Sequence, residues 1–215
     1  MRQLDATTSQ FTEQLDALLA WDLSVDSAID TQVSDIIKRV RTHGDEELLA
    51  LTRQFDRVDA AELSELEIGQ DELASAWAAL HSDAQQALQT AADRIRRFHV
   101  RQREESWSYV DELGCELGQK IQPLDRVGVY VPGGRAAYPS SVLMTLIPAK
   151  VAGVKEVVVV SPTPGGERNA MVLAALHLAG ADRVFAVGGA QAVAALAYGT
   201  QSVPQIGRAS CRERV

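Results

Sequence analysis

Cysteine is scarce in this sequence and long apolar runs are missing. Both absences exclude certain classes of protein. The 215 residues include two cysteines, Cys115 and Cys211, which form no CxxC or Cys/His spacing. This excludes a disulfide scaffold and offers no zinc motif. No apolar run approaches the roughly 20 residues of a membrane helix, and the N-terminus lacks the apolar centre of a signal peptide. We therefore expect a cytoplasmic protein with no membrane partner.

An excess of positive charge is also missing. The formal net charge is −8, which argues against a broad electrostatic interaction with nucleic acid. Five arginines do cluster between residues 94 and 103, but Asp93, Glu104 and Glu105 flank them. We interpret this cluster as a solvated helix face. Apolar residues make up 46% of the chain, which is ordinary for a soluble globular protein.

Residues 1–125 are predicted to be mostly helical. Ser24 and Asp26 can cap a first helix that ends at His43, and Asp45 can cap the next one. Residues 65–68 have the pattern of a short strand, residues 71–80 and 83–109 have helical patterns, and residues 115–121 alternate weakly like a strand. This region contains no catalytic constellation.

Residues 126–205 predict a different architecture. Three β-branched runs, at 127–131, 156–160 and 183–187, alternate with helical patterns at 140–152, 167–179 and 190–198. Gly153 and Gly180 stand where helix C-terminal caps are expected, and Pro148 should kink or divide the first helix. This β-α-β-α-β-α series predicts an α/β fold with parallel strands and right-handed crossovers.

Each of the three predicted strands is followed by a turn with glycine or proline. The turns are Pro132-Gly133-Gly134, residues 162–166 and Gly188-Gly189. Glycine lets a ligand approach the backbone, and a helix N-terminus beyond such a turn favours a pyrophosphate. Ser140 and Ser141 can cap the helix after the first turn or donate to a ligand. The GxGxxG and GxxxxGK[ST] motifs are absent, so the motifs alone leave two alternatives open: a nucleotide-binding domain, or a structural α/β domain with tight turns.

Longer segments carry a more specific resemblance. The segments VGVYVPGGRAAYPSSVLMTLIPAKVAGV and VGGAQAVAALAYGTQSVP closely resemble the histidinol dehydrogenase family, from near the start of the chain to about Gln205. The resemblance implies the N-terminal half of a zinc- and NAD-dependent homodimer. Such an enzyme oxidises L-histidinol through the aldehyde to L-histidine, the last step of histidine biosynthesis. It also implies an incomplete Rossmann-like NAD domain, which would explain the missing GxGxxG.

Two NAD-contacting positions of that family match this sequence. Tyr130 lies in the Tyr-x-Pro-Gly-Gly motif, and Gln191 lies in the Gly-Gly-Ala-Gln turn. An aromatic ring at the end of a strand can pack on a cofactor, and an amide can both donate and accept hydrogen bonds. Without the resemblance, Tyr130 would be interpreted as a packing residue and Gln191 as a helix-start cap.

The residues that perform the chemistry have no counterpart here. The resemblance implies a third NAD contact, an Asn in a Gly-Pro-Gly-Asn turn, just beyond Gln205. Zinc ligands (a Gln, two His and an Asp) and a Glu-His general-base pair follow further on. The four histidines of this chain are scattered over predicted helices at no ligand spacing; they are His43, His81, His99 and His177. We therefore expect a partial NAD surface here, no metal or catalytic residue, and no turnover by this chain alone.

The segment 206–215, IGRASCRERV, differs in composition from what precedes it. It matches, residue for residue, the translation of a common sequencing-library adapter. We interpret it as a non-native tail without function; a basic interaction tail is the alternative.

Two other functions remain open from the sequence. A paralogue with the same cofactor domain would act on another alcohol, such as a sulfonated diol. A naturally short, non-catalytic nucleotide-binding module would end near Gln205.

Overall fold

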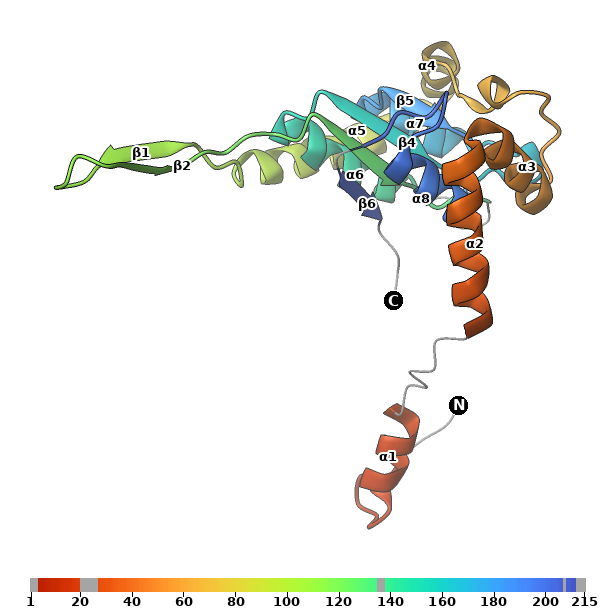
Figure 1. Ribbon diagram of the computed structural model, residues 1–215, viewed down its shortest axis with the longest axis horizontal. Helices are drawn as coiled ribbons and strands as arrows, with labels where there is room; N and C mark the ends of the chain where they lie inside the picture. Colours follow the sequence, from red (N-terminus) through yellow and green to blue (C-terminus); the bar gives the residue numbers. More distant parts are fainter. Residues whose placement is uncertain (1–3, 20–26, 135–137, 207, 212–215) are drawn as a thin grey trace. The chain divides into compact units, whose positions relative to one another are not determined.

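A computed structural model of the chain describes residues 4–19, 27–134, 138–206 and 208–211, and its elements are labelled in Figure 1. The chain divides into two compact units, residues 1–35 and 36–215. The first contains α1 (Phe11–Leu19), none of whose residues is buried, and the first half of α2 (Ser27–His43). The predicted caps Ser24 and Asp26 lie outside the described residues. The predicted end of this helix at His43 is confirmed.

The second unit begins with helices. After α2 come α3 (Asp45–Asp56), the short 3-10 helix η1 (Leu63–Leu66), α4 (Gln70–Ala78) and α5 (Ser82–Val100). Asp45 does not cap α3: the N-cap is Gly44, and the Asp45 carboxylate instead accepts hydrogen bonds from the backbone N–H and the hydroxyl of Ser202, at 3.2 and 2.6 Å. The predicted cap therefore serves as a tie to the loop that follows the last helix.

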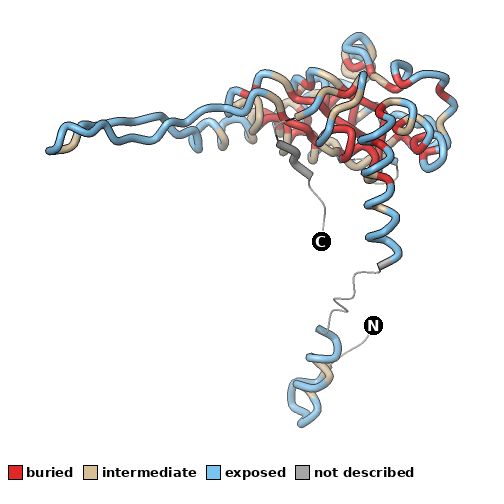
Figure 2. The backbone as a smooth tube through the Cα atoms, viewed as in Figure 1, coloured by how far each residue is buried: buried red, intermediate tan, exposed pale blue. Residues whose placement is uncertain are grey.

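A β-hairpin follows α5, and the sequence prediction of helix up to residue 109 is wrong here. Strands β1 (Trp107–Val110) and β2 (Glu116–Gln119) pair antiparallel, and every residue of both strands is exposed. In Figure 2 both strands of this hairpin are pale blue. The aromatic and β-branched residues of Trp-Ser-Tyr-Val favour a strand over the continuation of α5.

The centre of the second unit is a parallel sheet. Its strands are β3 (Arg126–Tyr130), β4 (Glu156–Val160), β5 (Arg183–Phe185) and β6 (Arg208–Cys211), in the spatial order β5-β4-β3-β6. In β4, Val157 to Val160 are fully buried, as expected for a strand covered on both faces. The mixed α/β class and the parallel pairing of the three predicted strands are confirmed.

Three helices connect and cover these strands: α6 (Pro139–Ala152), α7 (Ala170–Ala179) and α8 (Gly189–Tyr198). The predicted caps Gly153 and Gly180 end α6 and α7 with left-handed backbone angles, φ 91° and 75°. Pro148 does not divide α6, which runs through it as one helix. Ser140 and Ser141 lie inside the first turn of α6 and do not cap it, since Tyr138 is the N-cap residue and makes no side-chain cap bond.

The helices form two groups around the sheet. Helix α6 packs along α7, with α5 beside α6 and α4 beside α7, whereas α8 contacts α3 and β6. Alternate residues of a strand point to opposite faces. Gly128 of β3 lies against Leu196 of α8, so Gly128 and Tyr130 share the face that α8 covers. The buried residues, red in Figure 2, gather where these helices meet the sheet.

Both edges of the β5-β4-β3 sheet are paired. At the β5 edge, Ile68 donates its backbone N–H to Val184 and Ala186 donates to Leu66, at 2.8 and 2.7 Å. The predicted strand at 65–68 is therefore shorter than expected: Leu66 still belongs to η1, and Glu67 forms an isolated antiparallel bridge with Phe185.

At the β3 edge, β6 pairs in parallel. Strand β6 lies in the segment interpreted as a non-native tail. Strands pair through backbone hydrogen bonds, which many different side chains allow, so this pairing does not depend on a native sequence. The non-native origin of residues 206–215, and a domain division after residue 125, stay predictions.

No described helix is both long enough and apolar enough to cross a membrane.

Candidate functional site

The candidate site lies where the three predicted strands end. Because parallel strands point the same way, the turns after β3, β4 and β5 lie at one edge of the sheet. Hydrogen bonds align these ends: Val131 donates its N–H to the Val160 carbonyl at 2.9 Å, and Ser161 donates to the Phe185 carbonyl at 3.0 Å. All three glycine- or proline-containing turns of the sequence analysis are therefore neighbours.

The turns pack around Pro162, closely enough to require glycine on both sides of it. A Cβ added at Gly133 would lie 1.8 Å from the carbonyl oxygen of Pro162. A Cβ added at Gly188 would lie 2.3 Å from the Cβ of the same proline. Both distances are too short for any side chain: the Gly133 backbone lies against the Pro162 backbone, and the Gly188 backbone lies against the Pro162 ring. This gives glycine a packing role at these two positions, in addition to any approach of a ligand.

Tyr130 lies at the end of β3 and reaches the start of α8. Its phenol oxygen accepts a hydrogen bond from the backbone N–H of Gly189, at 3.1 Å. Gly189 is the first residue of α8, and the first N–H groups of a helix have no partner within it. The structure thus joins two of the predicted turns through a half-buried tyrosine.

Gln191 lies in the first turn of α8, two residues after Gly189, whose N–H Tyr130 accepts. Its side chain is 1% exposed. The Nε2 atom is buried and has no hydrogen-bond partner among the described residues. The N-cap of α8 is Gly188, and this helix start has no side-chain cap bond, so the capping alternative for Gln191 is wrong.

A buried amide with an unused donor is costly, by about 1–3 kcal/mol. The side chain folds back toward the helix start, because a Cβ at Gly189 would lie 2.6 Å from Gln191 Oε1. The unused donor and the N-terminal N–H groups of α8 therefore lie in the same place. A ligand with acceptor oxygens would satisfy both.

The turn after β4 adds small polar side chains that the sequence analysis did not single out. Ser161 and Thr163 are buried and line a small cavity together with Gly133, Gly134 and Pro162. The signal in the sequence was their position directly after a fully buried strand, at the edge where parallel sheets bind ligands. Asn169 caps α7 beside them, accepting from the N–H groups of Met171 and Val172.

The described residues contain no group of three or more His, Cys, Asp or Glu side chains that could hold a metal ion. The four histidines stay apart. His81 is the N-cap of α5, His99 contacts Gln102, His177 stacks on Trp77, and His43 ends α2. The donors present therefore do not fit a zinc site in this part of the chain.

Comparison with known proteins gives consistent matches. The family model described as Histidinol dehydrogenase matches residues 22–208. A histidinol dehydrogenase of Aromatoleum aromaticum is 56% identical over 206 residues, which cover 96% of this chain and 47% of that protein. The one of Chromobacterium violaceum is 54% identical, covering 96% and 48%. The chain spans about half the length of the curated relatives it matches.

A solved structure has the same fold over most of the chain. The crystal structure of histidinol dehydrogenase from Elizabethkingia anophelis superimposes with a TM-score of 0.77 at 28% identity. The match covers 84% of this chain and 41% of that one.

Proposed function

Because this chain belongs to the histidinol dehydrogenase family, we propose that it supplies part of the NAD-binding surface of a cytoplasmic enzyme that oxidises L-histidinol to L-histidine. The observation that carries the proposal is the buried, unpartnered Nε2 of Gln191 at the start of α8. A protein retains such a group at a cost to stability, and such groups are expected at functional sites.

The residues present fit one end of a dinucleotide. Strands β3, β4 and β5 are parallel, so their carboxyl ends lie at one edge of the sheet, and ligands of open α/β sheets bind outside the carboxyl ends of the strands. We therefore propose a Rossmann-like arrangement in which Tyr130, at the end of β3, packs on the cofactor. Gln191 and the N-terminal N–H groups of α8 would hold its oxygen atoms.

When bound, NAD accepts the hydride that leaves the alcohol carbon of the substrate. The residues of this chain would bind and orient the cofactor and exclude water from one side of it. We assign no catalytic residue to the described part of this chain. Zinc, the Glu-His base pair and the homodimer stay proposals for the whole enzyme, from the family resemblance.

A titration tests the proposal. Isothermal titration of the 215-residue chain with NAD should show saturable binding, and adding histidinol and NAD together should produce no NADH. A chain that is folded by circular dichroism and does not bind NAD at millimolar concentration would contradict the proposal. Zinc-dependent NADH production by the chain alone would contradict the expected absence of catalytic residues.

A further inference from the structure

Among the described residues, the buried side-chain atoms without a hydrogen-bond partner belong to Glu47, Asp56 and Gln191. Glu47 forms an ion pair with Arg39, which compensates its charge. Asp56 forms no ion pair within the part of the chain that the structure describes, and burial raises the pKa of its carboxyl. A buried charge without a partner destabilises a fold more than an unpaired amide does. The packing of the chain therefore explains neither Asp56 nor Gln191.

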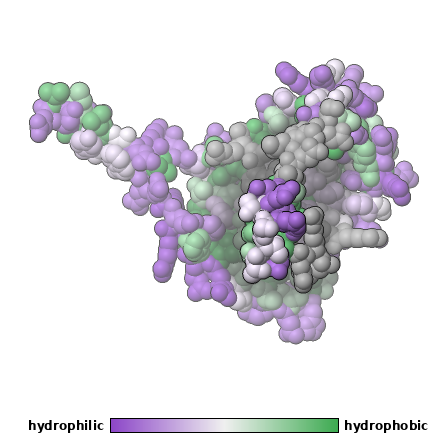
Figure 3. All heavy atoms as spheres, turned by 90° about the horizontal axis from the view of Figure 1, so that it is seen from below, coloured by the Kyte–Doolittle hydropathy of each residue, from purple (hydrophilic) through white to green (hydrophobic). Residues whose placement is uncertain are grey.

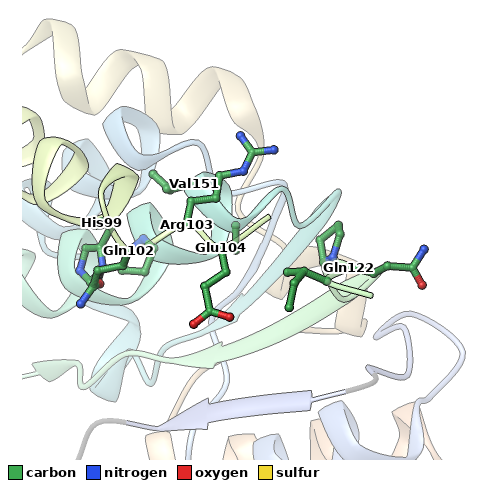
Figure 4. Close-up of a pocket in the computed structure, with 10 residues that line it drawn as sticks. His99, Gln102, Arg103, Glu104, Gln122 and Val151 are labelled. Carbon is green, nitrogen blue, oxygen red and sulfur yellow. Dashed lines mark hydrogen bonds between the residues drawn. The ribbon is translucent and has the colours of Figure 1, made fainter. Parts of the chain in front are cut away.

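The larger surface features of the described chain lack such a group. Figure 4 shows a pocket of about 370 Å³ between the end of α5 and α6, in which Arg103, Glu104 and Gln122 point in different directions. The polar groups of a binding site converge on one ligand, and these do not. The β1–β2 hairpin, at the left of Figure 3, carries hydrophobic and hydrophilic side chains together, and both strands are exposed throughout. Neither feature identifies a ligand.

Helix α3, which carries Asp56, begins near the amino edge of the sheet. The Asp45 carboxylate at its start accepts hydrogen bonds from Ser202, in the loop after α8. In the same loop, the carbonyl of Gln205 accepts a hydrogen bond at 2.8 Å from Arg126, the first residue of β3. The start of α3 and the loop after α8 therefore both lie near the amino ends of the strands.

Helix α3 ends at the carboxyl edge, on the side of β4 and β5. It contacts η1 and also η3 (Pro164–Gly166), which lies in the turn after β4. In η1, the carbonyl of Leu66 accepts the N–H of Ala186, the residue after β5, at 2.7 Å. Asp56 is the last residue of α3. It therefore lies at the same edge of the sheet as the turns of the candidate site.

The end of α3 is an unfavourable place for an acid. The C-terminus of a helix carries a partial negative charge, which destabilises a nearby carboxylate. Arg57, the next residue, adopts left-handed angles of φ 55° and ψ 40°, which favour Gly or Asn. The Arg53 guanidinium then holds the following loop by donating to the carbonyls of Ala60 and Ala61. Strain and unfavourable charge of this kind cluster at functional sites.

The proposed cofactor surface lacks the acid that dinucleotide sites use for the ribose. In such sites an Asp or Glu, about 20 residues after the first glycine turn, accepts a hydrogen bond from the 2′-hydroxyl of the adenosine ribose. Here β4 follows that turn, and at its carboxyl end come Ser161, Pro162 and Thr163. Glu156 lies at the amino end of β4 and pairs with Arg126 at 2.6 Å. An acid at the carboxyl edge therefore has to come from another element.

We propose that Asp56 supplies this acid, so that its carboxylate accepts a hydrogen bond from the 2′-hydroxyl of the adenosine ribose of NAD. This inference rests on the proposed function and adds a residue to it. The χ2 torsion of an aspartate is broad and two-fold, so either oxygen can turn toward a ligand at the 8% of the residue that is exposed. The same charge repels the 2′-phosphate of NADP. Asp56 thereby favours NAD over NADP.

A comparison of cofactor analogues tests the proposal. The 215-residue chain and Asp56→Asn are titrated with NAD, with NADP, and with NAD that lacks the 2′-hydroxyl of its adenosine. For the parent, the dissociation constants of NADP and of the deoxy analogue should exceed that of NAD at least about tenfold, because each loses a hydrogen bond to a charged group. Asp56→Asn should reduce both ratios at least about threefold. Asp59→Asn makes the same change at an exposed position after α3, and should leave both ratios unchanged.

Equal ratios for the parent and for a folded Asp56→Asn variant would overturn the proposal, whereas NAD binding, and with it the proposed function, would stand. A parent that binds NAD and the deoxy analogue equally tightly would also overturn it, and this result does not depend on any variant. A folded parent that binds none of the three dinucleotides would contradict the proposed function as well. Circular dichroism shows whether each variant is folded.

Discussion

The phenol oxygen of Tyr130 accepts a hydrogen bond from the backbone N–H of Gly189, 3.1 Å away. This bond joins the end of β3 to the start of α8, across the turns that we propose to hold NAD. Replacing Tyr130 with Phe keeps the ring and removes the bond. We expect the free energy of unfolding to fall by about 0.5–1.5 kcal/mol, the usual contribution of one hydrogen bond. Chemical denaturation measures it, and Tyr109→Phe, which changes an exposed tyrosine outside this contact, is the matched control. An unchanged stability of the Tyr130 variant would contradict the role of the bond.

Gly133 tests the packing of the turns. Its replacement by Ala places a Cβ 1.8 Å from the Pro162 carbonyl oxygen, so the turn must move. We expect a loss of at least about 2 kcal/mol in stability, in the range of overpacked sites, and weaker NAD binding.

Gly69→Ala is the control for Gly133. Gly69 has φ −70°, and a Cβ there meets nothing within 4 Å. This substitution should change stability by less than about 1 kcal/mol, because the restriction of the unfolded chain opposes the loss of a glycine N-cap of α4. Equal changes in stability for the two substitutions would show that the contact between Gly133 and Pro162 does not determine the stability of the turn.

Asp56 gives a pH dependence. Burial raises the pKa of its carboxyl above the usual 3.8, and its Oδ2 has no hydrogen-bond partner among the described residues. The folded state therefore binds this proton more tightly than the unfolded state. This contribution to stability falls as pH rises from about 3.8 through the raised value and is constant above it.

Asp56→Asn removes that titration. The variant should be more stable than the parent at pH 7, and the difference should shrink as pH falls toward 4. Urea denaturation at several pH values measures it. A difference that grows toward low pH would mean that the carboxylate is stabilised in the fold, contrary to the pKa shift.

Sequence patterns predicted β3, β4 and β5 well because most of their residues are buried. Residues 156–160 match β4 to the residue, and the glycines after α6 and α7 adopt the left-handed angles that their position required. The site residues Tyr130 and Gln191 were predicted from the family resemblance. They lie close together because the end of β3 meets the start of α8. No local sequence pattern predicts this tertiary contact.

The errors have local causes. Arg101 to Glu105 carry no Gly or Pro, so the end of α5 had no stop signal, although the aromatic residues of β1 favoured a strand. Asp45 had the type and position of a cap, but a tertiary partner, Ser202, takes its carboxylate. A long-range contact of this kind cannot be inferred from sequence spacing.

The origin of residues 206–215 is decided by DNA. We expect the source gene to continue after Gln205 with another sequence, one that encodes Gly-Pro-Gly-Asn. Sequencing the genomic locus checks it. An intact genomic copy that encodes IGRASCRERV would contradict the adapter interpretation. It would support the alternative, a basic interaction tail.

The most direct test of the account is the effect of Gln191→Met on stability and on NAD affinity together. Met has a similar shape and lacks the unpartnered amide, so the free chain should gain about 1–2 kcal/mol of stability. The affinity for NAD should fall at least about tenfold, because one cofactor contact is lost. Gln119→Met, at an exposed position, should change neither quantity. A Gln191 variant that is less stable and binds NAD as tightly as the parent would contradict the assignment of this residue to the cofactor site.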